Sequence, residues 1–236
     1  MDSEHNVLVV GSGAISTALL DEFNKKSIKV DQLKCSRTPK NGEFHLPLSL
    51  DEVDRLQDWI KGRGPFTLVI YSVGRSAADT GEIESTEQYS RLMHDNFFSI
   101  TSFVDHILPS VSGTPPVFIL NSIASVKHFE GPSISYHIAK QAVASYVQLN
   151  SRRVFKSLGM PLISVNLGNV LASGTVWDAK LKADRKNTEE LIKQVVPTGE
   201  FIKPIDIVNL VLDLNDSGAK KMLGASINFD NGQING

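Results

Sequence analysis

Short apolar runs alternate with segments of helical periodicity along almost the whole chain. The runs have the near-continuous hydrophobic character of buried strands, and each is followed by a stretch that reads as a helix. Repeated units of this kind predict parallel strands in a doubly wound α/β sheet with helices on both faces. We expect strands at about 7–10, 29–35, 67–71, 117–121, 162–166 and 226–230, and helices at about 15–26, 50–61, 86–108, 136–157 and from 204.

Length and composition fit one domain of this type. The chain has 236 residues, of which 41% are hydrophobic, enough to bury one sizeable core. Linkers, low-complexity runs and internal repeats do not interrupt the pattern. We therefore expect residues 1–236 to form a single Rossmann-type domain with about seven strands.

The charge distribution bears on possible partners. The formal net charge is −2 and like charges form no block, so nothing suggests nucleic acid or an anionic membrane as a partner. Cys35 is the one cysteine, which excludes an internal disulfide, and no metal-binding cluster is evident. The polar start and the shortness of the run at 7–10 argue against a signal peptide or membrane anchor. We expect a cytoplasmic protein with a small-molecule partner.

A glycine-containing loop joins the first expected strand to the first expected helix. Backbone amides and the helix dipole at such a position receive a pyrophosphate in dinucleotide-binding proteins. Ser16 stands where the third glycine of that motif is usual, and its hydroxyl could compensate by donating to a phosphate oxygen. The alternative is an ordinary turn between strand and helix. The expected cofactor-binding residues of the loop are Gly11, Ser12, Gly13, Ala14 and Ile15.

Four polar residues form a second pattern. Tyr136 and Lys140 are four apart, which places a phenol and an ammonium on one helix face. A neighbouring positive charge lowers the pKa of a phenol toward the range in which it exchanges protons. Ser122 ends an apolar strand, at the edge of the sheet where ligands bind in α/β folds, and Asn96 lies within the expected helix 86–108.

This ordered set resembles the short-chain dehydrogenase/reductase family, and the resemblance covers nearly the whole chain. It implies that Ser122 binds the substrate carbonyl oxygen and that Tyr136 transfers the proton. It also implies that Lys140 lowers the pKa of Tyr136 and holds the nicotinamide ribose, and that Asn96 anchors a proton-relay water. The activity implied is reversible hydride transfer between a nicotinamide and a ketone, aldehyde or secondary alcohol.

The resemblance extends to the cofactor segments. The stretch after the second expected strand lacks the acid that binds the ribose of NAD, and Ser36 and Arg37 favour NADP(H) over NAD(H). Arg37 could equally be a surface residue. Further contacts are expected from Val73 and Gly74, from the backbone of Val170 and from Thr175, although these stretches could be plain strand-to-loop turns. The family usually has an aspartate where residues 46–48 read Leu-Pro-Leu, so adenine recognition must differ.

Two regions bear on substrate and assembly. Residues 173–203 contain a charged run and apolar residues at helical spacing, which suggests a substrate flap. The resemblance implies a homodimer or homotetramer formed through the helices at 86–108 and 136–157. We assign no catalytic role to His128 or His137.

Other functions remain open for this sequence. A catalytically silent NADP-binding regulator of the same fold is the main alternative, because the cofactor motifs are irregular. An enoyl reductase would separate its tyrosine and lysine by more than four residues. An extended-type epimerase or dehydratase would need a substrate domain for which the segment after Pro204 leaves no room.

Overall fold

A six-stranded parallel sheet forms the centre of the molecule. The computed structural model describes residues 5–36, 42–45 and 50–235. Within them the main sheet has the order β2-β1-β5-β6-β7-β8, and every pairing is parallel. These strands are β1 (Asn6–Val10), β2 (Lys29–Leu33), β5 (Leu68–Tyr71), β6 (Val117–Ser122), β7 (Leu162–Leu167) and β8 (Ser226–Phe229). The predicted doubly wound fold is confirmed.

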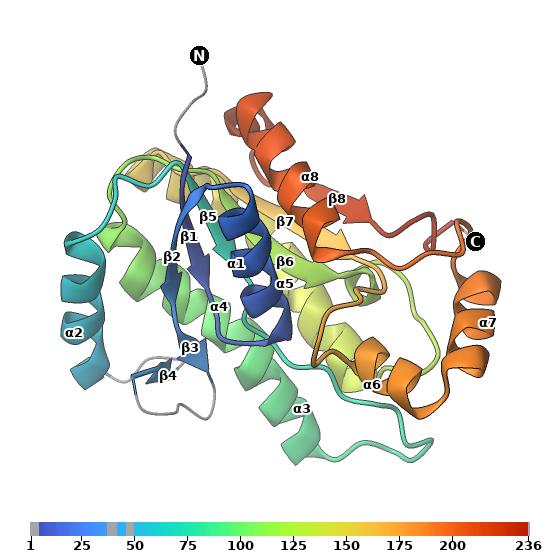
Figure 1. Cartoon of the computed structure of the whole chain (residues 1–236). Coiled ribbons are helices and arrows are strands. Elements are labelled where there is room, and N and C mark those ends of the chain that lie inside the picture. The colour runs from blue at the N-terminus through green and yellow to red at the C-terminus, as the bar shows by residue number, and fades with distance from the viewer. Residues whose placement is uncertain (1–4, 37–41, 46–49, 236) are drawn as a thin grey trace.

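The chain reverses its direction across the sheet between β1 and β5. From β1 it passes to β2 on one side, and it then returns to β5 on the other side of β1. Ligands in open α/β sheets bind at the carboxyl ends of the strands beside such a reversal. Figure 1 shows the start of α3 (Thr86–Met93) and the helices α6 (Val176–Ala183) and α7 (Arg185–Val195) on the side to which β1 and β5 point.

The second strand is shorter than expected. The strand predicted at 29–35 ends at Leu33, and β3 (Cys35–Ser36) pairs instead with β4 (Phe44–His45) in a separate parallel ribbon. The main sheet of the described residues therefore has six strands rather than about seven. Lys34 links the two sheets, because its carbonyl oxygen accepts a hydrogen bond from the Phe44 amide at 2.8 Å.

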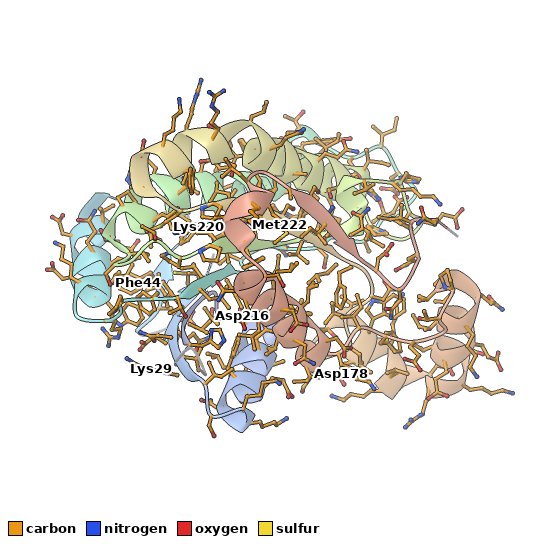
Figure 2. The ribbon with its side chains drawn as sticks, turned by 90° about the horizontal axis from the view of Figure 1, so that it is seen from above. Lys29, Phe44, Asp178, Asp216, Lys220 and Met222 are labelled. Atoms are coloured by element: carbon orange, nitrogen blue, oxygen red, sulfur yellow. The ribbon has the colours of Figure 1, made fainter. Side chains whose placement is uncertain are left out.

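Helices cover both faces of the sheet, as the alternating strand side chains require. Leu8 and Val10 face one hydrophobic cluster, whereas Val7 and Val9 face the other. The first cluster packs against α2 (Leu50–Lys61), the region 99–108 and α5 (Ile134–Leu158), and the second packs against α1 (Ala14–Lys25) and α8 (Pro204–Asp216). Seen from above, α1 and α8 lie on one side of the sheet and α5 on the other (Figure 2).

The helix predicted at 86–108 is interrupted twice. After α3 the chain forms a π turn at His94–Phe98, a short α4 (Ser99–Ser102), a second π turn at Phe103–Ile107 and a 3₁₀ turn at Leu108–Ser110. A π turn carries an extra residue and is found often at functional sites. Asn96 lies in the first of them. None of the helices in the described residues is long and apolar enough to cross a membrane.

Candidate active site

Tyr136 and Lys140 lie in the first turns of α5. Ser133 caps this helix, and its hydroxyl accepts a hydrogen bond from the Tyr136 amide at 3.2 Å. Lys140 follows one turn later and is buried. Its Nζ lies 5.7 Å from the centre of the Tyr136 ring. The expected phenol and ammonium therefore share one face of a well-capped helix.

Ser122 meets Tyr136 from the sheet. The serine is the last residue of β6, and its side chain interacts with that of Tyr136, which acts to lower the pKa of the tyrosine. The Ala124 amide donates to the same serine oxygen at 3.2 Å, in the 3₁₀ turn Ile123–Ser125, and so fixes its orientation. Asn121, the preceding residue, donates from Nδ2 to the Lys140 carbonyl oxygen at 3.2 Å and ties α5 to the strand end.

The acid–base properties of the pair differ from those the resemblance implies. Burial raises the pKa of Tyr136 above its ordinary value, and the interaction with Ser122 lowers it only in part. The implied lowering of this pKa by Lys140 is absent, because desolvation outweighs the favourable interactions of the phenolate. Burial also lowers the pKa of Lys140 from 10.5 to about 8. The site thus holds a protonated phenol beside a lysine that is mostly protonated at pH 7 and loses its proton at a lower pH than an exposed lysine.

Asn96 is held rigidly beside Lys140. Its Nδ2 donates to the carbonyl oxygens of Arg75 at 3.1 Å and Leu92 at 2.9 Å, and its Oδ1 accepts from the Arg75 amide at 3.1 Å. A side chain at Gly74 would begin 2.8 Å from Asn96 Oδ1 and 3.1 Å from Lys140 Nζ. Gly74 therefore allows the asparagine and the lysine to approach the same point.

The glycine loop adopts a compact turn before α1. Gly11 has a φ of +135°, and a side chain there would collide with the Ser16 hydroxyl. Ser16 is fully buried and its Oγ lies 2.6 Å from Ser72 Oγ, in a hydrogen bond between the two hydroxyls. The idea that Ser16 donates to a phosphate is therefore wrong, because its hydroxyl is enclosed between α1 and the end of β5.

The start of α1 is nevertheless open. Gly13 is its N-cap, and the first turn contains no acidic side chain. Apart from its chain neighbours, no atom of the described residues lies within 4 Å of the position of a Cβ at Gly13. The amides of Ala14 and Ile15 begin the helix behind this opening, where the dipole favours an anion. Ser12 lies beside it and donates from Oγ to the Cys35 carbonyl oxygen at 3.0 Å, which joins the loop to β3.

The segment after β7 presents backbone groups at the same edge of the sheet. Val170 forms a parallel bridge with Ile202, in which Asn169 and Leu171 make the hydrogen bonds. Because bonding groups alternate along a strand, the N–H and C=O of Val170 point away from Ile202. Thr175 caps α6, and its hydroxyl donates to the Ala172 carbonyl oxygen at 2.8 Å.

A cavity of about 460 Å³ adjoins this segment. It is lined by residues of the loop after Val170, by side chains of α6 and by Arg185, the first residue of α7. Asp178 and Lys182 form an ion pair of 2.8 Å at its edge. The expected flap region thus contains two helices that border a cavity next to the loop after Val170.

Only some of the other expected cofactor contacts lie within the described residues. Val73 is buried immediately before Gly74. Ser36 ends β3, and Arg37 and the segment 46–48 lie outside the described residues. Sequence reasoning overlooked Ser72 and Glu84. Ser72 directly precedes the expected contacts Val73 and Gly74, whereas Glu84 carries no signal in the sequence because its contacts are to backbone amides about fifty residues away.

His137 has a structural role. Its Nε2 accepts a hydrogen bond from the Phe129 amide at 3.1 Å, so Nδ1 carries the proton and donates to the Ser133 carbonyl oxygen at 2.9 Å. Its ring also lies 4.9 Å from that of His128, centre to centre. The described residues contain no group of three or more His, Cys, Asp or Glu side chains placed to hold a metal ion.

Comparisons with known proteins give matches in structure alone. No protein-family model matches the sequence, and no curated protein matches it. A short chain dehydrogenase family protein from Francisella tularensis subsp. tularensis SCHU S4 has a TM-score of 0.76 at 15% identity, over 98% of this chain and 100% of its own.

Two further solved structures have similar scores. A variant of actinorhodin polyketide ketoreductase with NADPH has a TM-score of 0.76 at 14% identity, over 100% of both chains. The enoyl-acyl-carrier-protein reductase (NADH) from Aquifex aeolicus VF5 has a TM-score of 0.73 at 17% identity, over 98% of this chain and 97% of its own. This chain therefore has the fold of the short-chain dehydrogenases and reductases.

Proposed function

We propose that this protein is an NADP(H)-dependent oxidoreductase of the short-chain dehydrogenase/reductase family that interconverts a ketone or aldehyde and the corresponding alcohol. The observation that carries the proposal is that the side chains of Tyr136 and Ser122 interact, with the buried ammonium of Lys140 one turn along the same helix. These groups lie at the carboxyl end of β6, next to the reversal of strand order where α/β sheets bind ligands.

The residues present fit a dinucleotide. The open start of α1 at Gly13 offers helix amides to a pyrophosphate, with Ala14 and Ile15 behind it. Val170 directs a donor and an acceptor from its backbone, which suits the carboxamide of a nicotinamide. Lys140 would hold the nicotinamide ribose. The hydroxyl of Thr175 is engaged in the cap of α6, so any contribution of that residue comes from its backbone.

The preference for NADP(H) is part of the proposal. Residues 34–38 read Lys-Cys-Ser-Arg-Thr and contain no carboxylate to repel a 2′-phosphate. Arg37 would pair with that phosphate, so its replacement by alanine should weaken NADPH binding and leave NADH binding nearly unchanged. Isothermal titration with both cofactors measures this. Equal losses for the two cofactors would contradict the assignment of Arg37.

The chain's own groups orient and protonate the substrate. The bound nicotinamide would supply or accept the hydride. Ser122 and Tyr136 would both donate to the carbonyl oxygen, and because these groups are already placed they would stabilise the negative charge that develops there. Tyr136 keeps its proton at neutral pH because burial raises its pKa. It is therefore a ready acid for reduction, whereas oxidation requires the phenolate and is favoured at alkaline pH.

A spectroscopic assay tests this function. The protein is mixed with NADPH and a panel of ketones and aldehydes, and loss of the reduced nicotinamide absorbance is followed. Turnover with at least one member of the panel is expected. Tight NADPH binding without turnover on a broad panel would instead favour the catalytically silent regulator.

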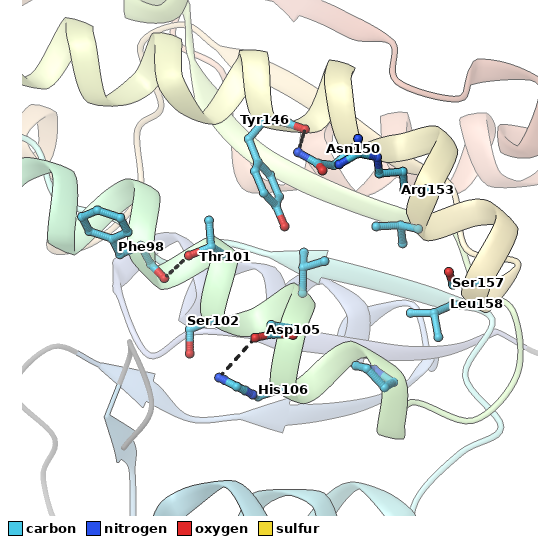
Figure 3. A pocket seen from close by; sticks show the side chains of 13 residues that line it. Phe98, Thr101, Ser102, Asp105, His106, Tyr146, Asn150, Arg153, Ser157 and Leu158 are labelled. Atoms are coloured by element: carbon cyan, nitrogen blue, oxygen red, sulfur yellow. Dashed lines mark hydrogen bonds and ion pairs between the residues drawn. The ribbon is translucent and has the colours of Figure 1, made fainter. Parts of the chain in front are cut away.

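We also propose a homodimer or homotetramer that forms through the region 86–108 and α5. A groove of about 690 Å³ runs between the region 98–109 and the second half of α5 (Figure 3). Tyr146 of α5 lines it, as does Phe98, which is 48% exposed. On α5, Ile138 is 42% exposed and Leu149 is 74% exposed. Light scattering should give a mass of two or four chains, and Leu149→Glu should reduce it.

A further inference from the structure

The loop after β5 is joined to the segment that leads into α5. Ala78 and Pro132 form an antiparallel bridge. The Asp79 amide donates to the Gly131 carbonyl oxygen at 2.7 Å, and the Ser133 amide donates to the Ala77 carbonyl oxygen at 2.9 Å. The loop that begins at Gly74, beside Asn96, is therefore continuous with the cap of the helix that carries Tyr136.

One side chain completes this connection. The carboxylate of Glu84 accepts hydrogen bonds from the Ile134 amide at 2.5 Å and from the Ser135 amide at 3.0 Å. Gln88 Nε2 donates to the same carboxylate at 3.0 Å and so orients it. Since α5 has no acidic residue in its own first turn, Glu84 supplies the negative charge that favours a helix start from a distant part of the chain.

The amides at the start of α5 are thereby all accounted for. Ile134 and Ser135 donate to Glu84, and Tyr136, the third residue, donates to the Ser133 hydroxyl. The hydroxyls of Ser133 and Ser135 also lie 3.1 Å apart and are hydrogen-bonded. The first N–H groups of a helix have no partner within the helix and must be satisfied by side chains or water. The orientation of Tyr136 in this turn thus depends on two caps, one local and one from Glu84.

We propose that Glu84 is a positioning residue for the reaction, whose carboxylate holds the first turn of α5 so that the Tyr136 hydroxyl meets Ser122. This role rests on the proposed function. Burial acts to raise the pKa of Glu84, but the hydrogen bonds from Ser135 and Ile134 outweigh it and lower the pKa below the ordinary value, with nearby Asp79 opposing them. Glu84 is therefore ionised, and its clamp is closed, throughout the neutral range.

Two variants isolate the effect. In Glu84→Gln the size is kept, but the negative charge is lost and one of the two accepting oxygens becomes an NH₂ group, which cannot accept from a helix N–H group. We expect kcat to fall by roughly tenfold or more, because a small misplacement of a catalytic group is costly, while the Kd for NADPH stays unchanged. Glu82→Gln removes a carboxylate from an exposed side chain two residues away and should match the wild type in both quantities.

Amide NMR tests the clamp without any substrate. The Ile134 and Ser135 protons should lie downfield in the wild type and follow the titration of Glu84 at acid pH, and both should move upfield in Glu84→Gln. Unmoved amides would overturn the clamp. A wild type that turns over carbonyl substrates, with an equally active Glu84→Gln variant, would overturn the positioning role alone. Absence of turnover in the wild type would refute the proposed function itself.

Discussion

Replacing Lys140 by methionine should stabilise the protein while it abolishes activity. The ammonium is buried, and burial lowers its pKa from 10.5 to about 8. At about 1.4 kcal/mol per pKa unit, this lowering amounts to roughly 3 kcal/mol of unfavourable free energy at neutral pH. Methionine has a similar shape and no charge, so Lys140→Met should raise the free energy of unfolding at pH 7 by up to roughly 3 kcal/mol.

The pH dependence gives a sharper form of this prediction. Below pH 8 both the folded and the unfolded wild type keep the Lys140 proton, and the full cost of burial is present. Between about pH 8 and 10.5 the unfolded state binds more protons, so the contribution of Lys140 to the free energy of unfolding rises with pH. The advantage of Lys140→Met should therefore shrink across this interval.

Urea unfolding of the two proteins at a series of pH values measures the difference. Burial raises the pKa values of Cys35 and Tyr71, which lowers stability at high pH, but these groups act in both proteins and cancel. Replacement of the exposed Lys186 by methionine serves as the control and should change stability by less than about 0.5 kcal/mol. A Lys140→Met protein less stable than the wild type at pH 7, or a difference independent of pH, would refute the reasoning.

Three further predictions concern the site. Gly74→Ala brings a Cβ to 2.8 Å from Asn96 Oδ1, an atom that cannot move without breaking hydrogen bonds, so kcat should fall about 100-fold and the free energy of unfolding by about 1–3 kcal/mol. The control Gly62→Ala, whose Cβ meets no atom of the described residues, should change neither quantity. A fully active Gly74→Ala variant would contradict the convergence of Asn96 and Lys140 on one point. The new methyl group of Gly13→Ala meets no atom of the described residues, so the substitution should cost at most about 1 kcal/mol of stability while it weakens NADPH binding in titration calorimetry. Unchanged binding would contradict a pyrophosphate site at the start of α1. Alcohol oxidation should accelerate as pH rises through the alkaline range, because the raised pKa of Tyr136 limits the phenolate, and a pH-independent oxidation rate would argue against that base.

Much of the fold follows from local pattern in the sequence. The helix at 50–61 coincides with its predicted bounds, and α5 starts two residues before its predicted start because Ser133 is its cap. The π turns at Asn96 and beyond could not be predicted, since they use residues that are equally at home in an α-helix. The break at Lys34 depends on pairing with Phe44, which is a tertiary contact without a local signal.

The candidate site shows the same division. The order of Ser122, Tyr136 and Lys140 could be read from spacing, because strand ends and helix faces are set by simple periodicities. The raised pKa of Tyr136 depends on burial, and the enclosed hydroxyl of Ser16 depends on Ser72, which follows β5. Both are consequences of packing between distant segments, which no local pattern encodes.

The most direct test of the proposed function is the turnover of Tyr136→Phe with NADPH and a reducible carbonyl substrate. This variant keeps the ring and removes the hydroxyl that interacts with Ser122. The proposal predicts that kcat falls by at least about 100-fold, the usual contribution of a general acid, while the Kd for NADPH changes little. A variant that reduces the same substrate at the wild-type rate would contradict the assignment of Tyr136 as the proton donor.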